Sequence, residues 1–313
     1  MTRDLVLRRN ELGFVVFFDR KVGRKKNSSF LAKKIFFLSM HPFFRGQICN
    51  EAYTVTFGDC AENEKGMQII GKSAGKGISV SQLKELEKKF TLLGMECKLI
   101  DLRQLLPSQN ASEAAVLILR NGVNGLLKDG GQDAVYKELR SMPKDKTFLK
   151  EGKVLNKHAR HNNTMSDYHQ EPDIANGKGT VVNFKDYQMT AKLRDTIADI
   201  LSFPAIVGEL NHYFDADKCY INFHGDEERK IVVGSRFGYG ANGFLLKFQW
   251  YKRKMPIGKE GKILLMSGDM YIMSEKAVGF DTYKNQWIPT LRHSAGKDRK
   301  RKLGEECVVL YKG

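Results

Sequence analysis

The stretch that decides the fold is Tyr220 to Glu228, which reads YINFHGDEE in the one-letter code. Its first four residues are typical of a short β-strand, and turn-forming polar residues follow them. His224 and Asp226 are two positions apart, so their side chains point to the same side of an extended backbone. An imidazole and a carboxylate placed in this way can bind one metal ion.

The segments around this stretch extend the pattern. Asn211-His212-Tyr213 precedes it, and a late histidine, His293, follows it. Between them are three apolar segments typical of strands, at 231–235, 244–251 and 262–274, and the last contains Gly-Asp just before a Met-rich run. The chain after Lys218 is therefore rich in predicted strands joined by short glycine turns, which favours a double-stranded β-helix, or jelly roll.

The order of these segments resembles that of the AlkB-like 2-oxoglutarate and Fe(II)-dependent dioxygenases, over roughly residues 205–296. The resemblance implies that His224, Asp226 and His293 are the iron ligands, a set known from non-haem Fe(II) oxygenases. It also implies that Asn211 and Tyr213 hold the co-substrate 2-oxoglutarate, and that O₂ is consumed. No catalytic side chain is expected beyond this metal site.

The chain departs from the family pattern in two places. The family has its second histidine soon after the Gly-Asp strand, whereas this chain has Phe280-Asp281-Thr282 there and His293 later. The family also carries arginines in the strand after that histidine, which pair with the co-substrate carboxylates. This chain has the sequence EECVVLYK at 305–312 instead. We therefore expect Arg301, or Arg299, in the preceding basic loop to supply the guanidinium.

Composition and charge limit the class of protein. The chain has 313 residues, 42% of them apolar, which is enough for two domains, and its formal net charge of +16 favours a polyanionic partner such as nucleic acid. Its five cysteines are scattered and form no C-x-x-C pair, which indicates reduced thiols and an intracellular compartment, cytoplasm or nucleus. No apolar run is long enough to span a membrane, so no membrane partner is expected.

We expect an α+β protein with three parts. Residues 1–45 carry eleven basic and three acidic residues and form a basic extension, which is either a nucleic-acid-binding or nuclear-targeting arm or a poorly ordered tail. Residues 46–150 form a small α/β accessory domain, with a strand at 53–57, a helix at 79–93 that Ser79 and Gln82 cap, and a second strand at 97–102. Residues 151–313 form the catalytic jelly-roll domain.

Two residues before the Asn211-His212-Tyr213 segment are candidates for holding a substrate. In the family, the segments that precede the Asn-x-Tyr motif grip nucleic acid. Lys157 and Arg160 lie in the corresponding segment of this chain. With the basic charge, they favour oxidative demethylation of nucleic acid as the activity. The same metal ligands would equally serve a dioxygenase that hydroxylates a protein side chain. A third possibility is a basic nucleic-acid-binding protein without catalytic activity, in which the three residues are unrelated.

Overall fold

A computed structural model describes residues 5–9, 15–19, 50–106, 111–128, 130–238, 240, 243–282, 284, 287–298 and 307–311. The chain divides into two compact units, Met1–Gly46 and Gln47–Gly313. In the first unit, β1 (Leu5–Arg9) and β2 (Val15–Asp19) form an antiparallel pair. All other elements belong to the second unit.

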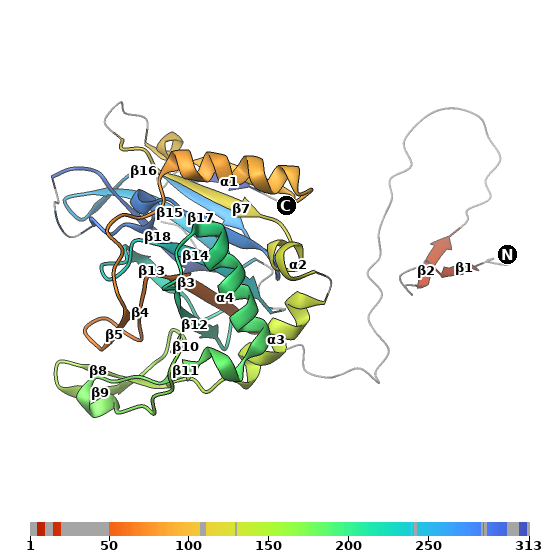
Figure 1. Ribbon diagram of the computed structural model, residues 1–313. Helices are drawn as coiled ribbons and strands as arrows, with labels where there is room; N and C mark the ends of the chain where they lie inside the picture. The colour runs from red at the N-terminus through yellow and green to blue at the C-terminus, as the bar shows by residue number, and fades with distance from the viewer. Residues whose placement is uncertain are drawn as a thin grey trace. The chain divides into compact units, whose positions relative to one another are not determined.

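The second unit contains two large sheets (Figure 1). The first has eight strands in the order β11 (Val181–Asn183), β10 (His161–Ser166), β12 (Val207–Tyr213), β3 (Ala52–Gly58), β14 (Val232–Phe237), β17 (Met270–Met273), β7 (Ala115–Leu119) and β6 (Cys97–Asp101). The second has five strands in the order β13 (Ile221–His224), β18 (Thr290–Gly296), β15 (Leu245–Lys252), β16 (Met255–Leu264) and β19 (Cys307–Tyr311). Among the described residues no strand is shared by the two sheets, so they do not close into a barrel.

The remaining elements are hairpins and helices. Two hairpins stand apart from the large sheets: β4 (Cys60–Glu62) with β5 (Ile69–Gly71), and β8 (Thr147–Lys150) with β9 (Lys153–Asn156). The helices are α1 (Val80–Leu92), α2 (Gly122–Leu127), α3 (Gly131–Ser141), α4 (Gln188–Leu201) and the single turn α5 (Glu275–Val278). Short 3₁₀ turns occur at Leu102–Leu105, Ile174–Asn176 and Phe184–Asp186.

The two faces of the eight-stranded sheet are covered differently. Successive side chains of a strand point to opposite faces, and in β3 the apolar residues Tyr53, Val55 and Phe57 all pack toward the helices. Helices α1 to α4 lie along this face (Figure 1). A second apolar core joins the opposite face to the five-stranded sheet, and it contains Ile118 of β7, Trp250 of β15 and Leu291 of β18. The order of layers is therefore helices, large sheet, small sheet.

Local sequence signals determine several of these elements. The helix expected at 79–93 is α1, and Ser79 caps it in the expected way, with reciprocal hydrogen bonds between Ser79 and Gln82. All five residues of β7 are buried, because both faces of this strand are covered. This explains why their sequence carries no alternation from which a strand could be distinguished from a helix.

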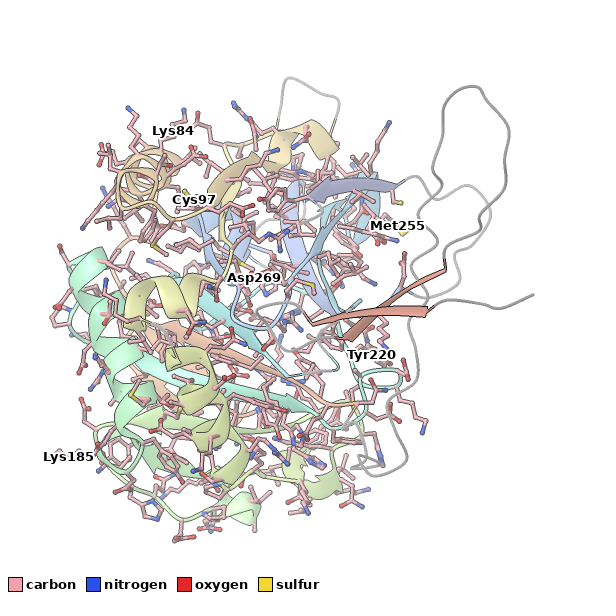
Figure 2. The ribbon with its side chains drawn as sticks, turned by 90° about the vertical axis from the view of Figure 1, so that its right-hand side faces the viewer. Lys84, Cys97, Lys185, Tyr220, Met255 and Asp269 are labelled. Carbon is pink, nitrogen blue, oxygen red and sulfur yellow. The ribbon has the colours of Figure 1, made fainter. Side chains whose placement is uncertain are left out.

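The Gly268-Asp269 turn holds β17 in place. Asp269 is buried, and its carboxylate accepts hydrogen bonds from the backbone N–H groups of Asn121, at 2.9 Å, and Met266, at 2.7 Å. It also pairs with Arg120. Figure 2 shows Asp269 in the interior, whereas Lys84 and Lys185 lie at the periphery. The turn thus attaches the first residue of β17 to the segment after β7.

The expected domain boundary at residue 150 is wrong. Strands β3, β6 and β7, from the segment 46–150, belong to the same sheet as β12, β14 and β17, from the segment 151–313. The second unit is one compact body from Gln47 onward. The local order of strand, helix and strand suggested a separate α/β domain, but the partners of these strands come from distant parts of the chain. The α+β class is confirmed.

Two further observations concern the whole chain. No helix among the described residues is long and apolar enough to cross a membrane. The four cysteines in the described part of the chain are unpaired; they are Cys60, Cys97, Cys219 and Cys307.

Candidate metal centre

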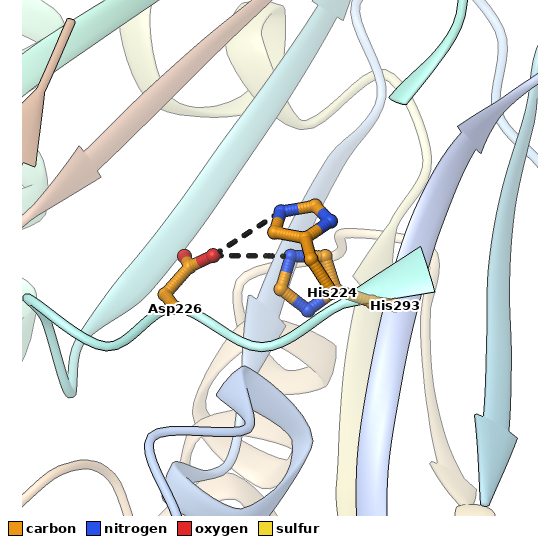
Figure 3. A group of neighbouring side chains, drawn as sticks. All are labelled: His224, Asp226 and His293. Carbon is orange, nitrogen blue, oxygen red and sulfur yellow. Dashed lines mark ion pairs between the residues drawn. The ribbon is translucent and has the colours of Figure 1, made fainter. Parts of the chain in front are cut away.

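The three expected metal ligands lie together (Figure 3). His224 ends β13 and His293 lies in β18, and the two residues are direct partners in the antiparallel pairing of these strands. Asp226 follows in the turn after β13. Its Oδ1 atom is 3.3 Å from Nε2 of His224 and 3.5 Å from Nε2 of His293. One potential ligand atom from each side chain lies within 4.8 Å of the other two, so one metal ion could contact all three.

The tautomer of His224 suits metal binding. Its Nδ1–H donates a hydrogen bond to the backbone carbonyl of Asn222, at 2.8 Å. A proton on Nδ1 leaves the lone pair on Nε2, which is the nitrogen that faces Asp226.

Close backbone packing holds the turn that carries Asp226. The backbone N–H of Asp226 donates to the carbonyl of Val278, at 3.1 Å, in α5. A Cβ atom at Gly225 would collide with the carbonyl oxygen of Gly279 and with the hydroxyl of Thr282. Phe280 to Thr282 is the segment in which the family would have its second histidine. In this chain, Thr282 of that segment packs against the turn instead.

Arg229 connects the metal centre to the large sheet. Its guanidinium is buried, and its Nε atom lies 3.2 Å from Oδ2 of Asp226 and 2.7 Å from Oε1 of Glu228. It also forms an ion pair with Glu209 of β12. Arg229 therefore binds the Asp226 oxygen atom that does not face the histidines, and so orients the carboxylate toward them.

The electrostatic surroundings favour the metal-binding protonation states of Asp226 and His293. Burial alone raises the pKa of Asp226, but Arg229 and the two histidines outweigh it and hold this pKa well below its usual range. Burial and the nearby His224 lower the pKa of His293 to about 4. Burial opposes the charge on His224 as well, although contact with Asp226 raises its pKa overall. At neutral pH, Asp226 is thus an anion and His293 a neutral imidazole with a free lone pair.

A cavity of about 630 Å³ opens beside the three ligands. Asn211 and Tyr213 of β12 line it, as the resemblance implied, and so does Arg160, whose Nε–H donates to the side-chain oxygen of Asn211. The cavity wall also includes Thr54 and Thr56 of β3 and residues of the β4–β5 hairpin. The cavity therefore lies among the large sheet, the small sheet and this hairpin.

Of the other expected site residues, Lys157 is described and does not line the cavity. Lys157 is buried, and its ammonium donates to the side chains of Asn63 and Asn162, so the expectation that it faces a substrate is wrong. Burial lowers its pKa to about 8. Arg299 and Arg301 lie outside the described residues. The strand after them, β19, pairs with β16 at the edge of the small sheet, and none of its residues lines the cavity.

Sequence reasoning missed several polar residues of the site. Arg229 and Glu62 line the cavity, and Arg236 lies buried beside it. A signal for Arg236 was available, since it is a cation within the otherwise apolar strand at 231–237. Glu62, in β4, is distant in sequence from the metal ligands and follows no motif.

The charge of the cavity wall is acidic, in contrast to the charge of the whole chain. Six carboxylates and three basic side chains line it: Glu62, Glu64, Glu209, Asp226, Glu227 and Glu228, with Lys65, Arg160 and Arg229. Each of the three basic side chains forms an ion pair with one or more of these carboxylates. Burial raises the pKa of Glu62 to about 7 and also raises that of Glu228, which reduces the negative charge. The remaining excess of carboxylates favours a cation in the cavity, such as a divalent metal ion at the three candidate ligands, which would offset the charge of an anion bound beside it.

The fold and the site define an α+β protein with two histidines and one aspartate clustered at an internal cavity. No family model matches the chain. An uncharacterized protein of Acanthamoeba polyphaga mimivirus is 38% identical to it over 252 residues, which cover 80% of this chain and 97% of the viral protein. The chain belongs to the same family as this viral protein.

Proposed function

We propose that the protein is an Fe(II)- and 2-oxoglutarate-dependent dioxygenase of the AlkB-like type. The observation that carries this proposal is the cluster of His224, Asp226 and His293 at the wall of a cavity. Two imidazoles and one carboxylate are a donor set that suits Fe(II) and leaves coordination positions for other ligands. The packing of a large and a small sheet around the cavity supports a jelly-roll relationship.

The residues of the chain would prepare the site for chemistry that the iron and its co-substrate supply when bound, namely oxidation of an unactivated C–H bond. His224, Asp226 and His293 would hold the metal, and Arg229 would keep the aspartate oriented. Asn211 and Tyr213 would bind 2-oxoglutarate. Because these residues are mostly buried, they would also limit the access of water to the metal.

Oxidative demethylation of nucleic acid is our substrate proposal. The net charge of +16 supports a polyanionic partner. The acidic cavity wall supports a reacting group with a positive charge, which some N-methylated bases carry. Together they suit a cationic base within a polyanion, and a base in a duplex would have to be flipped out of the stack to enter.

The acidic wall also favours a second candidate, a dioxygenase that hydroxylates a lysine or arginine side chain of a protein. Such a side chain carries the same positive charge without the phosphates. The non-catalytic alternative, a basic nucleic-acid-binding protein, predicts that the clustered histidines and aspartate bind no metal.

The first test is succinate formation from 2-oxoglutarate by the purified protein with Fe(II), ascorbate and O₂. We expect slow turnover without a substrate, lost in His224→Ala and retained in His169→Ala, a control at an exposed histidine. Methylated oligonucleotides and lysine- or arginine-containing peptides are then compared as stimulants of turnover. No turnover together with no binding of Fe(II) or Mn(II) would overturn the proposal in favour of the non-catalytic alternative.

A further inference from the structure

We propose that Arg236 binds the distal carboxylate of 2-oxoglutarate, the one away from the oxo group, and so takes the role that the family gives to arginines of its last strand. This inference rests on the proposed function and assigns to a described residue a contact that we had expected of Arg301.

Within the described part of the chain, Arg236 is a buried cation that forms no ion pair, although Asp269 contributes to its electrostatic surroundings. It is fully buried in β14, and none of its three guanidinium nitrogens has a hydrogen-bond partner among the described residues. Its guanidinium lies over the ring of Phe244, 4.7 Å from the ring centre. A buried charge that lacks a partner is costly to the fold. The arrangement is explained if the partner is an anion that binds during function.

The other buried arginines of this region are paired. Arg229 contacts three carboxylates, and Arg120 contacts Asp269. Arg236 therefore differs from these two arginines, because no ion pair with a described carboxylate compensates its charge. Burial lowers its pKa, which is the direction expected for a cation whose surroundings do not compensate its charge.

The position of Arg236 in the sheet places its side chain on the face that borders the cavity. It shares a strand face with Val232, which lines the cavity, and pairs in register with Thr54 of β3, which also lines it. Tyr213 and Tyr271, both in the cavity wall, are close enough to interact electrostatically with its guanidinium. Arg236 thus lies directly behind the wall formed by the two tyrosines.

The chemistry of this group of side chains suits a carboxylate. A guanidinium binds a carboxylate through two parallel hydrogen bonds, and tyrosine and threonine hydroxyls can donate further ones. A molecule with two carboxylates could approach the metal with one end and Arg236 with the other. A 2-oxo diacid such as 2-oxoglutarate has a carboxylate at each end and therefore meets this requirement.

The sheet topology explains why the guanidinium comes from β14. The strand that follows His293 along the chain, β19, lies at the edge of the small sheet and contributes nothing to the cavity wall. β3 pairs with β14 in the large sheet, and its residues Thr54 and Thr56 line the cavity. Neither strand contributes an arginine to the cavity wall. Arg160 and Arg229 do line it, but both already contact carboxylates, whereas the guanidinium of Arg236 has no hydrogen-bond partner among the described residues.

Calorimetry of the full chain, without O₂ and with Mn(II) in place of Fe(II), tests the inference. Wild-type protein should bind 2-oxoglutarate about a hundredfold more tightly than 2-oxopentanoate, which ends in a methyl group in place of the distal carboxylate. The variants Arg236→Met and Arg236→Gln, which remove the charge, should bind Mn(II) normally but lose most of this preference. Arg103→Met, at a half-exposed arginine, should behave like the wild type.

A second readout separates binding from a structural role. Replacing an unpaired buried charge by a side chain of similar length should raise the unfolding temperature of the ligand-free protein in Arg236→Met. A structural arginine would instead give a lower unfolding temperature. Addition of 2-oxoglutarate should then stabilise the wild type more than the variant.

The outcomes distinguish this inference from the proposed function. Wild-type protein that binds Mn(II) and 2-oxoglutarate, but does not prefer it to 2-oxopentanoate, refutes the role of Arg236 and leaves the dioxygenase proposal standing. An unchanged preference in Arg236→Met refutes it as well, and Arg236→Gln serves the same test if Arg236→Met does not fold. Wild-type protein that binds no Mn(II) refutes both proposals.

Discussion

His224 and His293 are opposite each other in the antiparallel pairing of β13 and β18, and the centres of their rings are 4.3 Å apart. Two of the three proposed metal ligands are thus brought together by a strand pairing. Asp226 comes from a turn instead, and depends on Gly225, Gly279 and Arg229 for its position. The two kinds of ligand should respond differently to mutation.

Replacing His293 by alanine should remove metal binding and leave the fold intact. Changes to residues that merely support ligands usually weaken metal binding ten- to a hundredfold, so loss of a ligand should cost more than about a hundredfold. Calorimetry with Mn(II) measures the effect, and His169→Ala is the control. Wild-type affinity in His293→Ala would mean that this residue is not a ligand.

Adding one methyl group at Gly225 should disrupt the centre without touching a ligand. In Gly225→Ala the new methyl group would meet the backbone of Gly279 and the hydroxyl of Thr282, so the turn must move and Asp226 with it. We expect weaker Mn(II) binding and a lower unfolding temperature. The matched control is Gly75→Ala, because a methyl group at Gly75 meets no atom within 4 Å. Equal behaviour of the two variants would contradict the packing described above.

Removing the guanidinium of Arg229 should destabilise the protein by about 3 to 5 kcal/mol, since three carboxylates would lose their buried partner. Urea unfolding of Arg229→Met measures this loss. The half-exposed Arg103, paired with Asp101, is the comparison, and Arg103→Met should change stability far less, because solvent screens this ion pair. If both variants lose the same stability, Arg229 does not have the structural role assigned to it.

Glu62 should make stability depend on pH between 4.5 and 7. Burial raises the pKa of Glu62 to about 7, and among the described residues it accepts a backbone hydrogen bond from Gly66 but forms no ion pair. The folded state thus holds a proton that the unfolded state releases near pH 4.5. As the pH rises through this window, Glu62 therefore lowers the free energy of unfolding.

The variant Glu62→Gln should lack this dependence. We expect it to match the wild type below pH 4.5 and to gain stability relative to it up to pH 7. The measurement is the difference in free energy of unfolding between the two proteins at several pH values. A difference that does not change with pH would show that Glu62 titrates normally.

The clustering of His224 with Asp226 was predictable from a short-range pattern, because their two-residue spacing places both on one side of a strand end. His293 was expected beside them only because of the resemblance to a known family, and the structure brings the three side chains together. The start of α1 was predictable from a short-range pattern too, since Ser79 and Gln82 are three residues apart. Such short-range patterns depend only on the local backbone conformation and not on the tertiary fold.

The residues that complete the site were not predictable, because they depend on pairings between distant segments. Lys157 was expected to hold a substrate because of its position before Asn211, yet its ammonium donates to Asn63 and Asn162 in the interior. Arg229 reaches Glu209 only because β12 passes beside the turn. The role of β3 in the wall of the cavity could not be inferred from its own sequence, which shows a strand but not its neighbours.

The central position of β3 also affects how the chain can be made. Ala52–Gly58 leaves the ribosome early, but both of its partners, Val207–Tyr213 and Val232–Phe237, are synthesised much later. Until then the strand has two unpaired edges, which are templates for association with other chains. The polypeptide therefore cannot complete its large sheet stepwise during translation, and a product truncated before Val232 would be aggregation-prone rather than partly functional.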